Sequence, residues 1–375
     1  MVGRRVALVS SSYHPHVGGV EEHVRRVALE LRRRGHEVVV WTVDRGENLG
    51  VRKVEGVEVW YLPTPLPARS VAGLRRLLGQ GPSAAAAWLR AHRSFRPDVL
   101  HVQCFGPNGT YATVLAGATR TPLVISSHGE TFADDHAIFD RSELSRRALG
   151  RAMRQACAVT GCSQVVLTDL ARFGPSIGLV VPNGVDLTQT VPPRAPADPP
   201  YILAYGRVEH TKGFDLLLEA FARAALAPCT RLVLGGTGSA LPALEMQSRA
   251  HGLEDRVDLP GRLSRAQVSE QLAGASVVVV PSRREAFGLV VLEAWHAGTP
   301  VVVTSRGGPA GLVTDGVDGL LADPEDAAAL GNAVARVLTE PGLADQLAQA
   351  GLRKVERYGW DRVAVAYESV YDACT

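Results

Sequence analysis

The sequence is poor in cysteine, has only three lysines among its 40 basic residues, and contains no long apolar run. No stretch approaches the roughly 20 apolar residues that a membrane-spanning helix needs, and the first residues carry no signal-peptide pattern. The cysteines are odd in number and scattered, without a C-x2-C pair, at Cys104, Cys157, Cys162, Cys229 and Cys374. We therefore expect a soluble, cytoplasmic protein with reduced thiols.

An excess of charge of either sign is also missing. The 40 basic and 38 acidic residues leave a formal net charge of +2 at pH 7, which excludes the overall basic surface typical of nucleic-acid binding. The sequence has no H-x-E zinc cluster, no P-loop and no D-x-D triplet of the kind that holds a sugar-nucleotide metal. His14 and His16 flank Pro15, but two nitrogen ligands are too few for a metal site. We expect neither a metal nor a cofactor.

Short β-branched runs alternate with helical patterns along all 375 residues. This rhythm and this length predict two doubly wound α/β domains. The strands expected in the first half are residues 5–10, 37–42, 57–62, 98–102, 122–126, 158–161 and 179–181. Those expected in the second half are 201–205, 231–234, 256–259, 276–280 and 300–303. Ligands of open α/β sheets bind at the carboxyl ends of the strands, so motifs at those ends matter most.

The segment 281–303, PSRREAFGLVVLEAWHAGTPVVV, is the most informative of the chain. Glu285 lies in the turn after an expected strand, and Glu293 follows eight positions later, about two turns along a helix that Gly288 opens. Free backbone N–H groups at that helix start suit a phosphate. Two carboxylates on a similar face can hold two parts of one hydroxyl-rich ligand. The alternative is a loop carboxylate and a surface-helix carboxylate without a shared role.

Two cations follow the first strand of the second half. Arg207 and Lys212 stand in GRVEHTKGFD, just before a helix expected to begin near Gly213. Positive side chains at a helix start suit a diphosphate leaving group, whose negative charge grows as the bond to it breaks. A solvated basic loop is the alternative interpretation.

Four further strand ends carry glycines, an arginine or a histidine. Gly18 and Gly19 follow the first strand and open a long helix, where a backbone without side chains can approach a bound group. Gly236 and Gly238, in GGTG, match a dinucleotide fingerprint only in part, because Leu241 replaces its last glycine. The remaining candidates are Arg262, after strand 256–259, and His128, after strand 122–126.

In order and spacing these motifs are similar to those of retaining GT-B glycosyltransferases of family 4, from residue 18 to the terminal helix. The resemblance implies two Rossmann-like, doubly wound domains that face each other across a cleft. It makes residues 1–185 the acceptor-binding domain, 186–200 a proline-rich linker, and 201–358 the nucleotide-sugar donor-binding domain. The terminal helix, 361–375, is expected to pack back on the first domain.

The resemblance also implies roles for single residues. It assigns the donor phosphates to Arg207 and Lys212, and the transferred sugar to Glu285 and, from the other domain, to His128. Further donor-binding residues implied are Gly18, Gly19, Gly236, Gly238, Arg262, Ala286, Phe287, Gly288, Leu289 and Glu293, the last at the ribose. Many relatives have an acidic residue directly after the histidine, whereas this chain has Gly129 and then Glu130. Whether Glu130 takes over that role stays open.

The function implied is metal-independent, retaining transfer of a hexosyl or N-acetylhexosaminyl group from a nucleotide-diphosphate sugar to an acceptor hydroxyl. A UDP-sugar is the favoured donor, and a GDP-mannose-dependent mannosyltransferase is the alternative. Within the same fold, a nucleotide-sugar epimerase, a phosphorylase or a sugar-nucleotide binder also stays open. The broken glycine fingerprint argues against a dehydrogenase.

The acceptor is not determined by any motif. The loops 13–17, 105–108 and 131–136 are expected to select a small molecule, a lipid-linked acceptor or a glycan. A basic amphipathic pattern in the first domain could dock on a membrane surface, although a solvated face over a core stripe is favoured. Its members are Arg75, Arg76, Arg90, Arg93 and Arg96, with Leu74, Leu77, Leu78 and Trp88.

Overall fold

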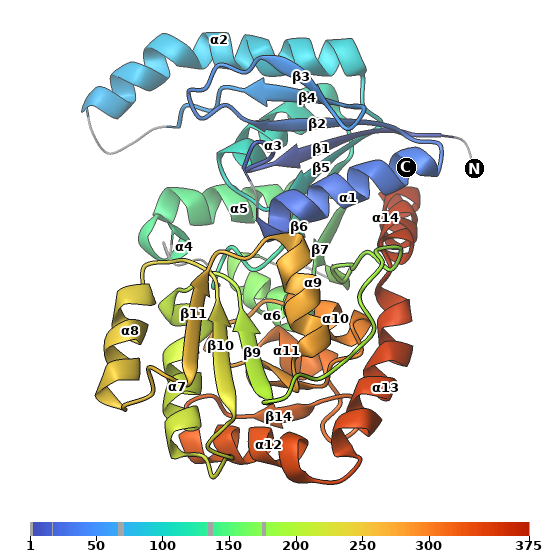
Figure 1. The fold of residues 1–375 in the computed structure, drawn as a ribbon. Coiled ribbons are helices and arrows are strands. Elements are labelled where there is room, and N and C mark those ends of the chain that lie inside the picture. The colour runs from blue at the N-terminus through green and yellow to red at the C-terminus, as the bar shows by residue number, and fades with distance from the viewer. Residues whose placement is uncertain (1–2, 17, 67–70, 134–137, 175–177, 375) are drawn as a thin grey trace. The chain divides into compact units, whose positions relative to one another are not determined.

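A computed structural model describes residues 3–16, 18–66, 71–133, 138–174 and 178–374. The chain divides into two compact units (Figure 1). The first consists of Met1–Asn183 together with Trp360–Thr375, and the second of Gly184–Gly359. Each unit is an α/β fold around a parallel sheet, as the alternating pattern predicts.

The sheet of the first unit has the strand order β3-β4-β2-β1-β5-β6-β7-β8 in the described part of the chain. Its strands are β1 (Arg5–Ser10), β2 (Glu37–Val43), β3 (Val51–Val54), β4 (Val57–Leu62), β5 (Val99–Gln103), β6 (Leu123–Ser127), β7 (Ala158–Gly161) and β8 (Gly178–Val180). All neighbours pair in parallel except β3 with β4. The central strands are apolar and buried because helices cover both faces of such a sheet. The short β3, polar and largely exposed, was not predicted.

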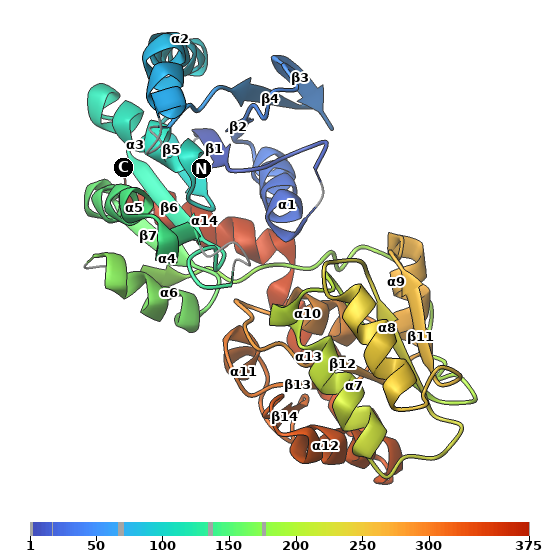
Figure 2. The ribbon, with the colours of Figure 1, turned by 90° about the vertical axis from the view of Figure 1, so that its left-hand side faces the viewer.

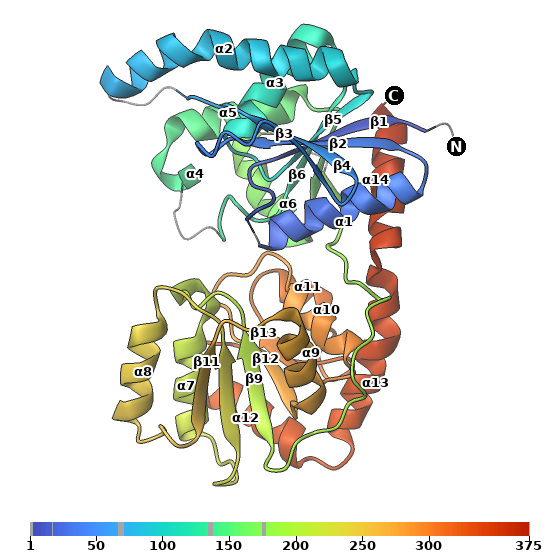
Figure 3. The same cartoon turned by 45° about the horizontal axis from the view of Figure 1, so that its top comes forward.

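Helices of the first unit lie on both faces of this sheet (Figure 3). They are α1 (Gly19–Arg33), α2 (Val71–Phe95), α3 (Pro107–Thr119), α4 (Ile138–Arg141), α5 (Glu143–Gln155), α6 (Gln164–Leu170) and α14 (Trp360–Cys374), with a 3-10 turn at Ala171–Phe173. The expected basic pattern falls on α2, where Arg75, Arg90 and Arg93 are exposed and Trp88 is buried. Within the described residues, no helix is long and apolar enough to cross a membrane.

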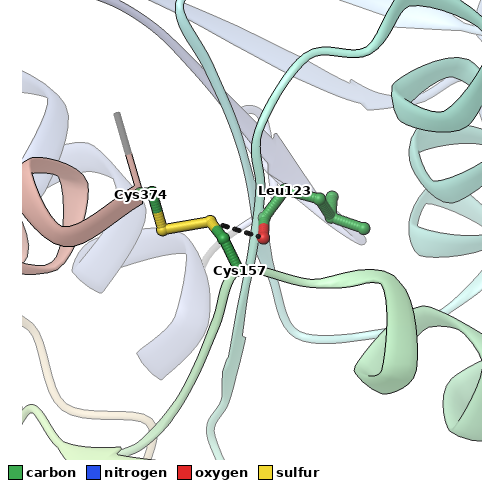
Figure 4. The surroundings of a disulfide bond; sticks show 3 residues. All are labelled: Leu123, Cys157 and Cys374. Atoms are coloured by element: carbon green, nitrogen blue, oxygen red, sulfur yellow. Dashed lines mark hydrogen bonds between the residues drawn. A yellow bond between two sulfur atoms is a disulfide. The ribbon is translucent and has the colours of Figure 1, made fainter.

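The terminal helix α14 packs beside α1 in the first unit. Trp360, Val363, Tyr367 and Tyr371 join the apolar core formed by α1 and the strands. A disulfide between Cys157 and Cys374 ties the end of α14 to the start of β7 (Figure 4). The expectation of reduced thiols is therefore wrong for these two cysteines. They are 217 residues apart, and only the return of α14 brings their Cα atoms to 5.5 Å.

The sheet of the second unit has the order β11-β10-β9-β12-β13-β14 in the described residues, with all neighbours parallel. Its strands are β9 (Tyr201–Tyr205), β10 (Arg231–Gly235), β11 (Val257–Gly261), β12 (Val277–Val280), β13 (Val301–Thr304) and β14 (Leu320–Ala322). The run of four valines in β12 is wholly buried, as expected of a central parallel strand. The three-residue β14 was not predicted.

In the second unit, helix α7 lies beside α8 (Figure 2) and also packs against α12, and the three helices share one apolar core. The helices are α7 (Phe214–Arg223), α8 (Leu241–Ala250), α9 (Arg265–Gly274), α10 (Leu289–His296), α11 (Gly308–Leu312), α12 (Ala327–Thr339) and α13 (Leu343–Val355), with 3-10 turns at His210–Lys212 and Glu356–Tyr358.

The expected linker, 186–200, is part of the second unit rather than a separate connection. The Ala195 amide donates to the Ala273 carbonyl oxygen, and the Ala197 amide to that of Gly274, each at 2.9 Å. Proline richness predicted a lack of regular structure, but it could not show that these backbone bonds hold the segment against the end of α9. The compact first unit ends at Asn183, where the expected first domain ended at residue 185.

Candidate functional site

The two loops that carry the predicted charges meet at the carboxyl ends of β9 and β12. The Thr211 carbonyl oxygen accepts hydrogen bonds from the amides of Arg283, at 2.9 Å, and Arg284, at 3.3 Å. Gly213 has φ of +68°, and a Cβ there would lie 2.1 Å from the Pro281 carbonyl oxygen. A glycine is therefore required where the loops cross.

Arg283 fastens the same two loops through its side chain. Its guanidinium donates to both carboxylate oxygens of Asp215, in the first turn of α7, at 2.7 Å each. It also donates to the His210 carbonyl oxygen at 2.9 Å. Burial acts to raise the pKa of Asp215, but the Arg283 guanidinium outweighs it and lowers that pKa. This bidentate pair fixes the loop that presents Lys212.

Lys212 and Glu285 form an ion pair in this setting. The Lys212 Nζ donates to Glu285 Oε2 at 2.6 Å, and the side chains are only 23% and 17% exposed. The Ala286 amide donates to the other oxygen, Oε1, at 3.1 Å. A cation and a carboxylate that are both partly shielded from water attract each other more strongly than a surface pair. The structure thus brings together two predicted residues that are 73 positions apart in the chain.

Glu293 is held by a tyrosine from β9. The Tyr205 hydroxyl donates to Glu293 Oε2, and burial together with the Glu293 charge raises the pKa of Tyr205 well above its ordinary value. Residues 285–288 are not helical and α10 begins at Leu289, directly after Gly288 as predicted. Glu293 therefore lies in the second turn of the helix, and Glu285 in the turn before it.

The start of α10 is formed by a glycine with positive φ. Gly288, with φ of +101°, precedes Leu289 and caps the helix without any side-chain hydrogen bond. Ala286 and Phe287 are buried in the turn before it. Gly308 packs against this turn, since its amide donates to the Glu285 carbonyl oxygen at 2.8 Å. The hydrogen bond from Gly308 therefore holds the turn after Glu285. The N-cap residue, Gly288, provides no side-chain acceptor for the first amides of α10.

Gly236 and Gly238 allow a third loop to pack against the Arg207 loop. A Cβ on Gly236, where φ is +138°, would lie 1.8 Å from the Gly206 carbonyl oxygen, and one on Gly238 would lie 2.2 Å from that of Val208. The Gly236 amide donates to the Gly261 carbonyl oxygen at 2.7 Å. These glycines therefore serve close loop packing at the strand ends.

The cations of these loops point outward. The Arg207 side chain follows β9 and is exposed, and Arg262 follows β11 and is exposed as well. Both lie at the same edge of the sheet as Lys212, because parallel strands end together. This edge of the sheet thus combines exposed positive charge with the carboxylates of Glu285 and Glu293, which are held by hydrogen bonds from Lys212 and Tyr205.

In the first unit, His128 lies just beyond β6 and is partly buried. Its Nε2 is 2.7 Å from Gln103 Oε1, and its ring meets the His23 ring edge-on with centroids 4.4 Å apart. Burial lowers the pKa of His128 to about 4, while the Asn183 side chain acts in the opposite direction. The imidazole is therefore neutral at pH 7.

Glu130 is turned into the protein. Its carboxylate accepts from the amides of Phe105 and His128 at 2.8 Å each, and from the Ser127 hydroxyl at 2.9 Å. Burial raises the pKa of Glu130, although these bonds act to lower it. Glu130 thus braces the backbone on which His128 stands, which is a role that its position in the sequence did not indicate.

Gly18 and Gly19 begin α1, as predicted. Gly18 is extended, with φ of −170°, and the Glu21 carboxylate lies over it. A Cβ on Gly18 would be 2.5 Å from Glu21 Oε2. Of the expected acceptor loops, residues 17 and 134–136 lie outside the described residues.

Sequence reasoning missed five residues that position the predicted ones, namely His23, His101, Gln103, Tyr205 and Arg283. A signal was present for two of them. His101 and Gln103 are polar residues two apart on a strand expected to be buried, so they share one face and must find partners there. Arg283 and Tyr205 had no such signal, because their partners lie 68 and 88 residues away.

Two family models match the chain. Residues 17–189 match the model described as Glycosyltransferase Family 4, and residues 188–354 match Glycosyl transferases group 1. The two matches meet at residues 188–189, shortly after the second unit begins at Gly184.

Relatives and solved structures agree with these models. A D-inositol 3-phosphate glycosyltransferase of Xylanimonas cellulosilytica is 32% identical over 100% of this chain and 97% of its own. A glycogen synthase of Mycobacterium tuberculosis is 31% identical over 98% of this chain and 94% of its own. The sucrose-phosphate synthase of Thermosynechococcus elongatus has a TM-score of 0.81 at 24% identity, covering 98% of each chain. HepE of Anabaena, solved with UDP and glucose, has a TM-score of 0.77 at 21% identity over 98% of this chain and 99% of its own.

Proposed function

The chain belongs to family 4 of the glycosyltransferases and catalyses glycosyl transfer, and on this basis we propose that it is a retaining, metal-independent enzyme that uses a nucleotide-diphosphate sugar, with a UDP-sugar favoured. The group transferred is a hexosyl or N-acetylhexosaminyl unit, and the acceptor atom is a hydroxyl oxygen. The Lys212–Glu285 ion pair is the observation that carries this proposal.

The pair holds two groups that a sugar nucleotide needs side by side. When the donor binds, its diphosphate takes Lys212 as a partner, and hydroxyls of the sugar take Glu285 and the amides that follow it. The ion pair keeps both side chains in place beforehand, because each is partly buried and neither is left without a counter-charge. Binding therefore exchanges one set of charge-assisted bonds for another.

Arg207 and Lys212 stabilise the departing diphosphate. Both follow β9, and the negative charge on the leaving oxygen grows as the glycosidic bond breaks. In this proposal the two cations provide the charge stabilisation that a divalent metal provides in other enzymes. Arg262 and the glycine loop of Gly236 and Gly238 border the nucleotide at the same strand ends.

Glu293 holds the ribose. Its carboxylate is oriented by the Tyr205 hydroxyl, and a carboxylate is a good acceptor for two neighbouring hydroxyls. The first amides of α10, at Gly288 and Leu289, contribute further donors near the sugar and phosphate.

His128 acts on the donor sugar from the first unit. A neutral imidazole can donate one hydrogen bond and accept another without adding a buried charge. Glu130 supports it by fixing the backbone rather than by touching the ligand.

The mechanism we favour is displacement on one face of the sugar. The acceptor oxygen bonds to the anomeric carbon on the side from which the diphosphate leaves, the bond from that carbon to the phosphate oxygen breaks, and the acceptor proton passes to the departing oxygen. The configuration is retained. Glu285 is engaged by Lys212, so it is suited to orienting the sugar rather than to forming a covalent intermediate.

A nucleotide panel tests the proposal. UDP, GDP, ADP and TDP are added to the full chain in thermal-shift measurements, and a ligand at 100 times its dissociation constant stabilises the fold by about 2.7 kcal/mol. We expect the largest shift with UDP, and release of UDP from a UDP-sugar once an acceptor is supplied. A larger response to GDP would change the donor but not the reaction. If no nucleotide diphosphate binds and none is released, the proposed function is wrong.

A further inference from the structure

A chain of buried polar side chains connects the terminal helix to His128 within the first unit. His101 and Gln103 lie on β5 and are fully buried. They are two residues apart on one strand, so their side chains emerge on the same face. Gln103 is also in register with Ser126 on β6, which is in register with Thr160 on β7. This polar row is unusual in the middle of an otherwise apolar parallel sheet.

The distances along the chain are all those of hydrogen bonds. His128 Nε2 lies 2.7 Å from Gln103 Oε1, and Gln103 Nε2 lies 3.1 Å from His101 Nε2. His101 Nδ1 lies 2.7 Å from the Tyr371 hydroxyl oxygen on α14. The Ser126 hydroxyl adds a contact of 2.6 Å to His101 Nε2. Tyr371 is 270 residues from His101 in the sequence, so only the return of α14 completes the chain.

The direction of these bonds follows from the orientation of the Gln103 amide, whose oxygen faces His128 and whose nitrogen faces His101. Burial lowers the pKa of His101 to about 3 and that of His128 to about 4, so both rings are neutral and each carries one N–H. Gln103 Oε1 can only accept, so His128 carries its proton on Nε2. The Gln103 amide donates to His101 Nε2, which therefore accepts, and His101 Nδ1–H donates to the Tyr371 oxygen.

We propose that Gln103, His101 and Tyr371 are positioning residues that hold His128 in the Nε2–H tautomer and in one ring orientation before the donor binds. This inference rests on the proposed role of His128 at the donor sugar. With its Nε2–H engaged by Gln103, His128 has Nδ1 as a fixed acceptor, so no reorientation is needed when the ligand arrives. The terminal helix thereby acts on His128 through His101 and Gln103.

A purely structural role is the competing explanation, because buried polar groups need partners whatever the function. The two explanations differ in what happens when the Tyr371 hydroxyl, at the far end of this row of hydrogen bonds, is removed. Without the Tyr371 hydroxyl, the His101 proton moves to Nε2, where Ser126 can accept it. Gln103 must then turn its oxygen toward His101 and its amide toward His128, which moves the His128 proton to Nδ1.

Nuclear magnetic resonance of the full chain with ¹⁵N-labelled histidine reads the tautomer directly. The His128 signals are assigned as those lost in His128→Gln. We expect a single Nε2–H tautomer in the unsubstituted protein, and a change to Nδ1–H or to a mixture in both Gln103→Met and Tyr371→Phe. Gln103→Met keeps the length of the side chain, and Tyr371→Phe keeps the ring, so two independent variants protect the test against misfolding.

Thr121→Val is the matched control, because it removes the hydrogen bond from a different histidine of the same unit, His92, at 2.9 Å. The His128 signals of Thr121→Val should not change.

In turnover assays, Gln103→Met and Tyr371→Phe should lower kcat by about tenfold, with the donor KM unchanged, since the tautomer alters the reacting state more than donor binding.

The proposal is overturned if His128 is the Nδ1–H tautomer or a mixture in the unsubstituted protein, or if neither variant alters it. It is also overturned if the tautomer changes while kcat does not. An unsubstituted protein without turnover on any donor would count against the proposed function instead, and the resonance data would still decide whether Gln103 and Tyr371 orient His128.

Discussion

At the scale of single residues, the proposed donor-binding edge of the second unit, at the carboxyl ends of β9 and β12, depends on side chains that restrain one another. Asp215 holds Arg283, and Arg283 holds the loop of Lys212 against the loop of Glu285. Lys212 in turn engages Glu285 directly. A charge that is partly buried is costly to leave without a partner, so this arrangement keeps the edge ordered until the donor arrives.

The substitution Glu285→Gln tests the role of Glu285 separately from that of Lys212. Glutamine keeps the shape and can still accept from the Ala286 amide, but it lacks the charge that orients the sugar. We expect turnover to fall by roughly 10² to 10³. The Kd for UDP, measured by calorimetry, should change little, because the proposed partner of the diphosphate is Lys212.

Glu325→Gln is the control for that variant, since Glu325 pairs with Arg306 on an exposed surface. It should leave both turnover and UDP affinity as they are. Equal losses of turnover and of nucleotide binding in Glu285→Gln would show that the residue serves binding in general, and the assigned role would then be wrong.

At the scale of elements, helix α14 has several structural roles in the first unit. It fills the core beside α1, carries Tyr371 to His101, and ends in the disulfide from Cys374 to Cys157. The Arg34 guanidinium adds a bidentate pair with Glu368 on the same helix, at 2.8 Å for each bond. The helix is therefore held at its middle by charge and packing, and at its end by a covalent bond.

Cys374→Ser should lower the free energy of unfolding by about 2–4 kcal/mol, because the disulfide closes a loop of more than two hundred residues. Urea denaturation with and without a thiol reductant measures this. The unsubstituted protein should lose the same amount on reduction, and the variant should not respond.

Cys229→Ser, which alters an exposed free cysteine, should behave like the unsubstituted protein in both conditions. If the reductant has no effect on the unsubstituted protein, the bond between Cys157 and Cys374 does not contribute to its stability.

At the scale of the whole molecule, sensitivity to acid should reside in the first unit. Burial lowers the pKa of His23, of His101 to about 3, and of His128 to about 4. A histidine whose folded pKa lies below its unfolded value of about 6.5 stabilises the fold fully above that pH, and the stability is lost as the pH falls toward the folded pKa. The raised pKa of Glu130 acts in the opposite direction.

We expect the free energy of unfolding to decrease below pH 6.5 by about 1.4 kcal/mol per pH unit for each such histidine. Urea denaturation between pH 7 and pH 5 measures the slope. His101→Gln should reduce this slope by the contribution of one histidine. His14→Gln, which alters an exposed histidine, should leave the slope unchanged. A stability that is constant over this range would contradict the burial of neutral histidines in the fold.

Much of the fold could be predicted from the sequence because its signals are local. Runs such as Val277–Val280 and the turns at Gly213 and Gly288 depend on neighbours in the chain, and the predicted strands fall within one or two residues of those observed. The family, the two α/β units and glycosyl transfer followed from motif order and were confirmed. The strands β3 and β14 were missed because they are short and lack a distinctive pattern.

The sequence by itself determined where the candidate residues stand, because local patterns predict the strands that precede Lys212 and Glu285 and the helix that carries Glu293. Only the tertiary structure decided which groups are partners. It paired Lys212 with Glu285, turned Glu130 inward, joined Cys157 to Cys374, and connected Tyr371 to His128 through His101 and Gln103. Most of these contacts join residues tens to hundreds of positions apart. Glu130 is close in sequence to its partner His128, but the inward orientation of its side chain depends on packing. No periodicity or spacing in a single sequence encodes them.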